Sequence, residues 1–428
     1  HRNKNLVVAN TIQTLSDHGS QVYSITDNPE RQLLTSEGVF TSACGITAYK
    51  GGAFPAPYDQ SITFVAEPVS NIVHVDVLVD KNTTFQAQRI ETPTGEFMAS
   101  TDFWFRPVNM YVGPDGSLYV LDYYRQIIEH PEWMSEEAIQ SGELYNGGDM
   151  GRIYRITHED QNTESWMEDL PLSEASSEKL VEHLAHPNAW WRLNAQRLLI
   201  DRNATDVQDQ LVQLVNDQDS PSSLGRLHAL WTLEGLGTID VETILTGLGD
   251  PVAGVRENSI RIAEYHLEEY PQLLDKLVQM TDDPDPKVRF QLLCTLGYDR
   301  SERSEMARID LLFQDIHDPW VQVAALSADS FEAEGVLSDL IRNYDQGKSQ
   351  FNPLIGRLSE LLVTGEEKDY MLSILQRALT QLRNQNSRGW ESTVLNGLSR
   401  GINQNRNAVV HFADHKKALL DLFIDHPD

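Results

Sequence analysis

The run from Glu129 to Trp133 places a histidine between two carboxylates. Its order is Glu-His-Pro-Glu-Trp, so His130 follows Glu129 directly and stands two positions before Glu132. A histidine titrates near neutral pH, and a carboxylate beside it can orient the ring to take a proton from an alcohol. In the structural alternative, His130 caps the helix predicted after Ser135, and Trp133 belongs to the core. The pattern therefore indicates either a general base or a helix cap.

A second candidate base, His74, lies on a predicted strand. Valines alternate with His74 and Asp76 along residues 73–79, so the valines should face a core and the polar side chains a wetter surface. Glu67 ends the preceding predicted strand, next to Pro68. If the wetter surface lines a channel, His74 can act on a substrate there. If it lines a groove between sheets, these polar side chains pair locally.

Short strands are predicted to position these residues. The predicted strands are rich in β-branched and aromatic residues and are bounded by Gly and Pro; they lie at 6–9, 21–25, 61–65, 71–78, 106–112, 117–122 and 152–156. Gly113-Pro114-Asp115-Gly116 predicts a tight hairpin turn. A helix over 136–141 is predicted between Ser135 as its cap and Gly142 as its stop. Strands of this length and spacing are typical of a sandwich or a propeller.

A helical repeat follows from about residue 158. Turn-like dipeptides that end in proline recur every 30 to 35 residues, at His186-Pro187, Ser220-Pro221, Asp250-Pro251, Asp283-Pro284 and Asp318-Pro319. Because proline suits the first turn of a helix, each is predicted to start one. Four copies carry Arg five residues later, namely Arg192, Arg226, Arg256 and Arg289, and these can reach back to the inter-helix turn. The pattern resembles HEAT repeats and predicts an α-solenoid.

The chain divides by composition near residue 157. Aromatic residues are denser before it, which gives a β part over 1–157, a solenoid over 158–336 and a helical continuation or cap over 337–428, with helices at 355–362, 369–383 and 418–423. Adjacent helical residues diverge by about 100°, so Trp190 and Trp191 cannot both bury on one face, and one of them could contact the β part.

Charge and cysteine content exclude several classes of function. The formal net charge is −30, and such a surface repels phosphate backbones, so no nucleic-acid partner is expected. No apolar stretch is long enough for a transmembrane helix. Two cysteines, Cys44 and Cys294, cannot form a disulfide framework or a Cys-rich zinc site. No dense acidic run specifies Ca²⁺, so no metal ligands are assigned.

Longer motifs in the β part resemble a known family. They are Asp17-His18-Gly19, FTSACGITAY at 40–49, FVAEPVSNIVH at 64–74, FMASTDFWFRPVN at 97–109, GPDGSLYV at 113–120, DYYRQIIEHPEW at 122–133 and GDMGRIY at 148–154. Together they resemble the membrane-bound dehydrogenase-like family of Planctomycetes, Verrucomicrobia and Bacteroidetes, which is related to sorbosone and soluble aldose dehydrogenases. The resemblance covers residues 5–157.

The resemblance implies a fold, a chemistry and a location. Members look like a six-bladed β-propeller followed by HEAT repeats, often with a c-type cytochrome domain. They are exported, which implies a periplasmic, extracellular or cell-envelope location. The implied chemistry is oxidation of a sugar or alcohol, with pyrroloquinoline quinone (PQQ) and Ca²⁺ in the propeller. A c-type cytochrome or another protein docking on the solenoid is the implied partner.

Three arginines are candidates to hold PQQ under this resemblance. PQQ carries three carboxylates, and the guanidinium groups of Arg106, Arg125 and Arg152 could pair with them. Arg106 begins a predicted strand and Arg125 follows the end of the next, so both could lie near one rim. Alternatively, the three arginines pair with nearby aspartates, such as Asp102, Asp122 or Asp149, and fasten loops.

The chain departs from the family pattern in two ways. Its 157 β-rich residues correspond to about three blades, and it has no Cys-x-x-Cys-His haem motif. We therefore expect the C-terminal half of such a propeller, with the HEAT-like part as a docking arm. Two functions are left open: a fragment of a PQQ-dependent type of sugar or alcohol dehydrogenase, or a non-catalytic scaffold that binds polysaccharide or protein.

Overall fold

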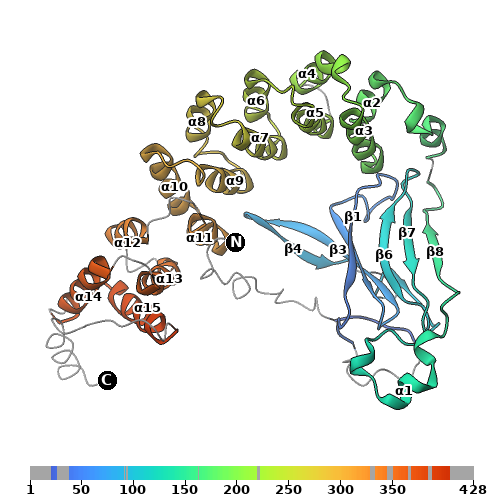
Figure 1. Cartoon of the computed structure of the whole chain (residues 1–428), viewed down its shortest axis with the longest axis horizontal. Coiled ribbons are helices and arrows are strands. Elements are labelled where there is room, and N and C mark those ends of the chain that lie inside the picture. Colours follow the sequence, from blue (N-terminus) through green and yellow to red (C-terminus); the bar gives the residue numbers. More distant parts are fainter. Residues whose placement is uncertain are drawn as a thin grey trace. The chain divides into compact units, whose positions relative to one another are not determined.

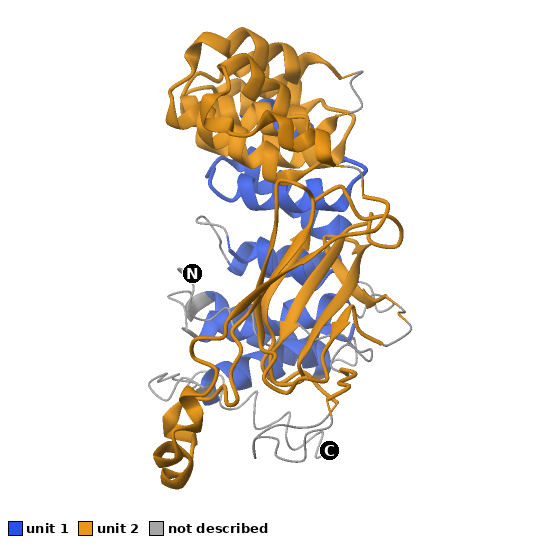
Figure 2. Cartoon of the chain, turned by 90° about the vertical axis from the view of Figure 1, so that its right-hand side faces the viewer, with its two compact units in different colours: residues 1–12, 274–428 blue, residues 13–273 orange. Residues whose placement is uncertain are grey.

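The computed structural model combines antiparallel sheets and helices (Figure 1). Contacts divide the chain into two compact units, residues 13–273 and residues 1–12 with 274–428 (Figure 2). The described residues are 21–26, 38–90, 92, 95–161, 163–218, 222–327, 333–344, 350–364, 368–383 and 388–404. Four features named from the sequence lie outside them: the strand at 6–9, the Asp17-His18-Gly19 motif, the Ser220-Pro221 turn and the helix at 418–423.

The first sheet follows the order of the chain. Its strands are β1 (Cys44–Tyr49), β2 (Ile62–Glu67), β3 (Ile72–Lys81) and β4 (Thr84–Arg89), and the short β5 (Met98–Ala99) pairs with β3. The strands predicted at 61–65 and 71–78 are thus confirmed as β2 and β3. The strand predicted at 21–25 is wrong: Gln21 makes an isolated bridge to Val39, and the Tyr23 backbone N–H donates to the Glu96 carboxylate at 2.9 Å.

The second sheet contains β6 (Pro107–Val112), β7 (Leu118–Asp122) and β8 (Arg152–Ile156), in that order. The predicted hairpin turn between β6 and β7 is confirmed, since the Gly113 N–H donates to the Ser117 carbonyl at 2.9 Å and Gly116 has a φ of +77°. The predicted helix is α1 (Glu136–Ser141), which Ser135 caps through the Ala138 N–H. Gly142 ends it with a φ of +77°.

The core of the β part lies between the two sheets. Contacts join β1 and β2 to β6, and the cluster includes Phe64, Val75, Met110, Leu118 and Val120. Burying apolar side chains from both sheets stabilises the β part at about 25 cal/mol per Å² of apolar surface removed from water. The described β part therefore holds two packed sheets, where the sequence predicted about three blades.

The predicted wetter face of β3 is wrong at its first half. Val73 and Val75 are buried as expected, but His74 is buried as well, with 1% of its surface exposed. Phe40 lies edge-on to the His74 ring, with ring centroids 5.2 Å apart. This end of β3 is covered on both faces, so the alternation of valines does not distinguish inside from outside here.

Helices of the 13–273 unit pack as consecutive pairs. They are α2 (Ser177–His183), α3 (Ala189–Asp201), α4 (Gln208–Asn216), α5 (Ser223–Leu236), α6 (Val241–Leu248) and α7 (Ala253–Tyr265), with α8 (Pro271–Val278) at the boundary between the units. The first helix of each pair contacts the next first helix, and the second contacts the next second, so two rows form (Figure 1). The boundary between the two compact units falls within α8, between residues 273 and 274, and does not coincide with the change in composition at residue 157.

The recurring prolines start helices only in part as predicted, whereas the recurring arginines contact the turns as predicted. Pro319 opens α11 (Pro319–Ala325) as predicted, but Pro187 and Pro251 precede α3 and α7 by two residues, because Asn188 and Val252 take the capping position. The arginines do reach back to the turns. Arg192 donates to the His186 carbonyl at 2.6 Å, Arg256 to the Asp250 carbonyl at 2.9 Å, and Arg289 to the Asp283 carbonyl at 2.7 Å.

The helices of the other unit continue to the end of the described chain. They are α9 (Pro286–Leu296), α10 (Glu302–Gln314), α11, α12 (Ala333–Arg342), α13 (Phe351–Thr364), α14 (Lys368–Arg383) and α15 (Trp390–Gln404). The helices predicted at 355–362 and 369–383 are confirmed as parts of α13 and α14, whereas α15 was not predicted. No helix among the described residues is long and apolar enough to cross a membrane.

The β6–β7 turn is the joint between the β part and α3. Asn188 donates to the carbonyls of Gly113 at 2.9 Å and Pro114 at 3.2 Å, and Trp191 Nε1 donates to Pro114 at 2.8 Å. The Asp115 and Gly116 carbonyls are also occupied: Thr163 donates to the first, and the hydroxyl of Tyr49 to the second. Trp191, which is fully buried, is therefore the member of the tryptophan pair that contacts the β part.

Candidate functional site

The loop between β7 and β8, residues 123–151, is held closed by one arginine. Arg125 Nη1 donates to the carbonyls of Tyr123 at 3.0 Å, Tyr124 at 2.9 Å and Gly147 at 2.7 Å. Gly147 has a φ of +87°, and a Cβ there would lie 2.7 Å from the Tyr124 carbonyl oxygen, so only glycine permits this closure. The two ends of the loop are thereby brought together over a cavity.

This cavity, which we call the 123–148 pocket, has a volume of about 650 Å³. Its lining comes from both ends of the loop and consists of Tyr123, Arg125, Ile127, Ile128, Glu129, His130, Pro131, Leu144, Tyr145 and Gly148. Binding sites for small molecules are commonly of this size, mostly apolar with a few polar groups. The pocket brings together three residues singled out from the sequence: Arg125, Glu129 and His130.

His130 and its acidic neighbours have a defined geometry. His130 caps the 3₁₀ turn over Pro131–Trp133, with its Nδ1 accepting from the Glu132 N–H at 3.3 Å. Glu129 accepts from the backbone N–H of His130 at 2.8 Å, and the nearest Glu132 carboxylate oxygen lies 3.9 Å from His130 Nδ1. The capping alternative is wrong for the predicted helix, because Ser135 caps α1 and His130 caps this preceding turn instead. The other part of that alternative, which placed Trp133 in the core, is also wrong, because Trp133 is 69% exposed.

Arg106 is buried and fully engaged by backbone. Its guanidinium donates to the carbonyls of Pro68 at 2.8 Å, Arg125 at 3.0 Å and Gln126 at 2.8 Å. Burial lowers the pKa of Arg106 to about 10, although the charges of Asp122 and Asp102 oppose that change. Arg106 therefore fastens loops together, as the alternative interpretation held, but through carbonyl groups.

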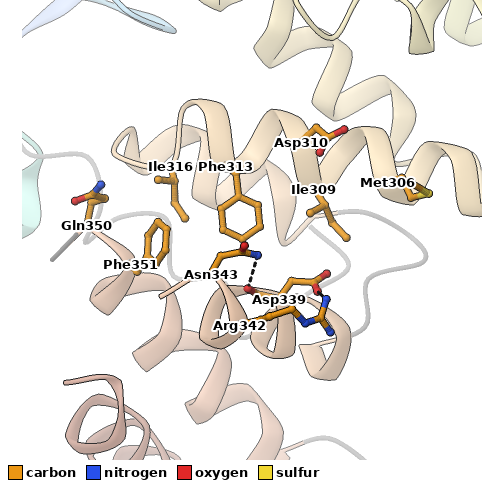
Figure 3. Close-up of a pocket in the computed structure, with 10 residues that line it drawn as sticks. All are labelled: Met306, Ile309, Asp310, Phe313, Ile316, Asp339, Arg342, Asn343, Gln350 and Phe351. Atoms are coloured by element: carbon orange, nitrogen blue, oxygen red, sulfur yellow. Dashed lines mark hydrogen bonds and ion pairs between the residues drawn. The ribbon is translucent and has the colours of Figure 1, made fainter. Parts of the chain in front are cut away.

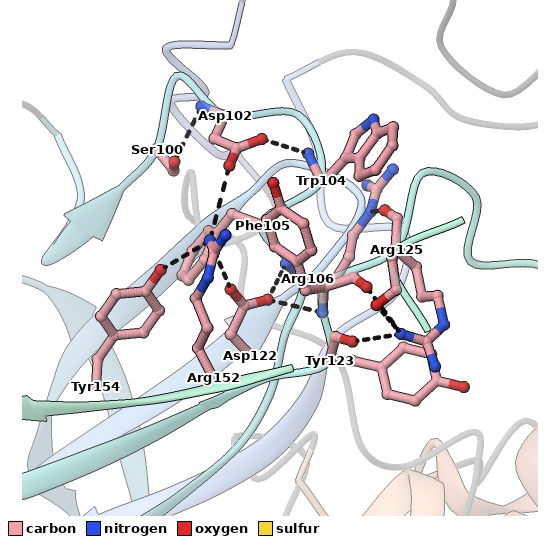
Figure 4. A network of polar contacts seen from close by, with 12 residues as sticks. Ser100, Asp102, Trp104, Phe105, Arg106, Asp122, Tyr123, Arg125, Arg152 and Tyr154 are labelled. Atoms are coloured by element: carbon pink, nitrogen blue, oxygen red, sulfur yellow. Dashed lines mark hydrogen bonds and ion pairs between the residues drawn. The ribbon is translucent and has the colours of Figure 1, made fainter. Parts of the chain in front are cut away.

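Arg152 lies apart from the pocket, over the ring of Tyr124 at 3.8 Å from its centroid. Its Nη1 is 3.8 Å from Asp102 and 4.0 Å from Asp122. Figure 4 shows Arg152 and Arg125 on opposite sides of this polar network. Burial raises the pKa of Asp122, while N–H groups of Arg106 and Tyr124 that donate to its Oδ1 oppose the rise. The three candidate arginines therefore do not converge on one site.

The described residues do not fit a PQQ site. Three carboxylates require guanidinium groups with free N–H donors, but Arg106 and Arg125 Nη1 are committed to carbonyls and Arg152 lies elsewhere. No group of three or more His, Cys, Asp or Glu within the described ranges could hold a metal ion such as Ca²⁺. We therefore assign no chemical step to PQQ.

His74 lies in a different, closed cluster. Its Nδ1 is 2.7 Å from Glu96 and its Nε2 is 3.1 Å from Asp76, while Arg89 Nη1 lies 3.1 Å from the other Glu96 oxygen. Burial alone would lower the pKa of His74, but hydrogen bonds and charge from Asp76 and Glu96 outweigh it and raise the pKa. Both ring nitrogens are occupied, so His74 stabilises the β part in the manner of the local-pairing alternative.

Glu67 is also enclosed. Its side chain has 0% exposure and accepts from the Ser42 N–H at 2.8 Å and the Thr41 hydroxyl at 3.2 Å. Burial raises its pKa, although these hydrogen bonds oppose the change. Glu67 therefore holds the 41–42 segment against β2 and faces no open channel.

Sequence reasoning missed the aromatic part of the pocket. Tyr145 is 75% exposed and Tyr123 is 48% exposed, and both line the cavity beside Arg125. The signal available was Tyr145-Asn146-Gly147-Gly148, an aromatic residue in a glycine-rich turn where no core face is predicted. Glu96 and Asp122 were also not singled out as buried carboxylates.

Residues 1–160 match a family model described as a domain of unknown function, DUF7133. No curated protein matches the chain. The match covers the β part and ends just after β8, so it contains the whole 123–148 pocket.

Proposed function

We propose that the chain belongs to an exported sugar or alcohol dehydrogenase and that the 123–148 pocket binds its hydroxylated substrate. The observation that carries the proposal is the convergence of Arg125, Glu129 and His130, chosen from the sequence alone, on one cavity of about 650 Å³. The sheet order β1-β2-β3-β4 supports the propeller part of the proposal, because a blade is a four-stranded antiparallel meander. The paired helices with arginines in their turns support a HEAT-like solenoid.

The pocket has the mixture of groups that a sugar needs. A sugar ring presents apolar C–H faces and hydroxyl groups, and a tyrosine ring offers an apolar face with a polar edge. Tyr123 and Tyr145 supply such rings, and the guanidinium of Arg125 lies over the Tyr123 ring, 4.1 Å from its centroid. Arg125 Nη2 makes one long hydrogen bond, of 3.5 Å, to the Gly148 carbonyl and would orient a substrate hydroxyl.

His130 would take the hydroxyl proton in this proposal. For that role Nε2 must carry a free lone pair, so the ring proton must reside on Nδ1. Nδ1 would then give up the capping bond from Glu132 N–H and donate to the Glu132 carboxylate, which is 3.9 Å away. Glu129 holds the backbone of His130 in place. The electron acceptor, by resemblance a quinone with Ca²⁺ and a cytochrome relay, is assigned to none of the described residues.

One observation favours a second function, a non-catalytic scaffold that binds polysaccharide or protein. His130 Nδ1 accepts a hydrogen bond, so the neutral ring carries its proton on Nε2. Nε2 is then a donor to a ligand hydroxyl and cannot remove its proton. In this function the pocket recognises a sugar and leaves it unchanged.

A binding and turnover experiment separates the two. D-glucose, D-sorbitol and maltohexaose are titrated calorimetrically into the full chain, and dye reduction is followed with and without added PQQ and Ca²⁺. Tyr145→Ala should weaken binding about tenfold, the loss of one aromatic contact, whereas Tyr111→Ala, an exposed tyrosine outside the pocket, should not. Dye reduction that His130→Gln abolishes without loss of binding supports the dehydrogenase. Binding without dye reduction supports the polysaccharide-binding scaffold, and no binding of any of the three sugars contradicts a sugar site in the 123–148 pocket under either function.

A further inference from the structure

A groove in the unit of residues 274–428 has no role in the proposed function. It lies between α10, the end of α12 and the start of α13, and its volume is about 580 Å³ (Figure 3). Met306, Ile309 and Phe313 line it from α10, and Phe351 lines it from the start of α13. The ring centroids of Phe313 and Phe351 are 5.7 Å apart, so the two helices meet at the apolar floor.

The α10 wall is an apolar stripe that the fold covers only in part, since Ile309 and Phe313 are half-buried and Met306 is exposed. Met306, Ile309 and Phe313 are spaced by three and four residues, which places them on one side of the helix. Such stripes are normally covered, yet Met306 is 61% exposed at the mouth of the groove. Methionine is flexible and enriched at interfaces, where it adapts to the shape of a partner. The stripe therefore has the character of a surface that receives another apolar segment.

The rim of the groove carries a net negative charge. Asp339 and Arg342 pair with each other at 2.7 Å on α12, so their charges largely cancel. Asp310 on α10 is exposed, and no cation within the described ranges pairs with it. The chain as a whole has a formal charge of −30, which disfavours an acidic occupant further. An occupant must therefore combine apolar side chains with a cation opposite Asp310.

We propose that this groove binds a short amphipathic helix of a partner protein, with Lys or Arg beside its apolar face. A helix in a hydrophobic groove anchors through apolar residues at spacings of three and four, which matches the spacing of the α10 stripe. The lysine or arginine pairs with Asp310 at the rim and sets the orientation of the helix. An acidic segment would lack the ion pair with Asp310, and a wholly polar segment would lack the apolar contact with the α10 stripe.

Fluorescence anisotropy with the full chain tests the proposal. The probe is a labelled synthetic helix of leucine and lysine, LKKLLKLLKKLL, with two counterparts in which every leucine is serine or every lysine is glutamate. The leucine–lysine peptide should bind at least about tenfold more tightly than either counterpart. Since both faces contribute, binding should weaken only partly when the salt concentration is raised.

A matched pair of variants distinguishes the groove from general attraction to an acidic protein. Met306→Ser with Asp310→Lys should weaken binding about tenfold, and both positions are exposed, so the fold is kept. Tyr265→Ser with Asp209→Lys makes the same changes at exposed positions in the 13–273 unit and should leave binding unchanged. Equal loss in both variants, equal binding of the serine counterpart, or no binding of the leucine–lysine peptide would overturn the proposal.

Discussion

Trp191 Nε1 donates a hydrogen bond of 2.8 Å to the carbonyl oxygen of Pro114, across 77 residues of sequence. This bond joins the tip of a β-hairpin to the first turn of α3. It is reinforced by Asn188, whose amide donates to the same carbonyl and to that of Gly113. The β part and the first helices are therefore joined through backbone acceptors that any residue type could supply, and through side-chain donors that depend on Asn188 and Trp191.

Replacing Trp191 by Phe should weaken this joint. The substitution removes one hydrogen bond and leaves a small cavity at a fully buried position, while Pro114 still accepts from Asn188, so the expected loss is about 2 kcal/mol of unfolding free energy. Urea denaturation of the full chain measures it. Trp190→Phe is the control, because Trp190 is only partly buried and its indole makes no hydrogen bond to the turn within the described structure. An equal loss in the two variants would show that the bond to Pro114 adds nothing.

Acid should destabilise the same joint through His186. Burial, together with the charges of His183 and Arg192, lowers the pKa of His186 to about 4. The unfolded chain takes up this proton near pH 6.5, and the folded chain only near pH 4, so stability is lost as the pH falls through that window. The expected loss is about 1–3 kcal/mol, since each pKa unit corresponds to about 1.4 kcal/mol.

Denaturation midpoints between pH 4 and pH 7 measure this dependence. His186→Gln keeps an acceptor for the Asn188 N–H, which in the parent chain donates to His186 Nδ1 at 3.0 Å. The variant should make the profile less steep, while His228, whose pKa burial also lowers to about 4, keeps part of the slope. His158→Gln, at an exposed position, should leave the profile as steep as in the parent chain. A His186→Gln profile that is as steep as the parent would assign the acid sensitivity to other groups.

The buried Arg226–Asp250 pair should be far costlier to break than an ion pair at the surface. It is bidentate, at 2.7 and 3.1 Å, and both side chains are 2% exposed. Arg226→Met leaves a buried carboxylate unpaired, so we expect a loss of about 3–5 kcal/mol. Adding Asp250→Asn should restore most of it, because the amide still accepts from the Val252 N–H.

The matched control is a solvent-exposed ion pair on the protein surface. Arg303→Gln breaks the pair with Asp275, in which both side chains are 57% exposed, and should change the unfolding free energy by at most about 1 kcal/mol. Thermal and chemical denaturation of the variants give the comparison. Similar losses for Arg226→Met and Arg303→Gln would mean that burial does not govern these pairs.

Glu96→Gln should lower the pKa of His74. The hydrogen bond and charge of Glu96 are among the causes that raise this pKa, and glutamine retains the shape without the charge. The stabilisation from protonated His74 is full below the unfolded pKa of 6.5 and is lost as the pH rises through the folded pKa, so the variant should lose it at lower pH. Histidine NMR titration follows the ring directly. An unchanged His74 titration would contradict the assigned partner.

Local spacing predicted the elements well and the burial of polar side chains poorly. The Gly113–Gly116 turn, the cap at Ser135 and the arginines of the helical turns follow from rules that act within a few residues, and all three are present. The strand at 21–25 failed, because Tyr23 makes its hydrogen bond to Glu96, far along the chain. A hydrogen bond between two residues so far apart in the chain leaves no periodic pattern in the sequence.

The candidate site was predicted in part for the same reason. Arg125, Glu129 and His130 come from one continuous loop, so their sequence proximity placed them together. For Arg106 the sequence left two roles open, pairing with the carboxylates of PQQ or with nearby aspartates, but the carbonyls of Pro68, Arg125 and Gln126 that enclose it are backbone atoms common to every residue. No property of the side chains marks which carbonyls will meet a guanidinium.

The hairpin tip has a consequence for engineering this chain. Tips of β-hairpins are usually the places where a chain accepts a tag, a cut or an inserted domain. Here the carbonyls from Gly113 to Gly116 accept hydrogen bonds from Tyr49, Thr163, Asn188 and Trp191. A fusion at this turn would separate the β part from its helices, whereas the β3–β4 turn is exposed at Asn82 and is the better place to put a label.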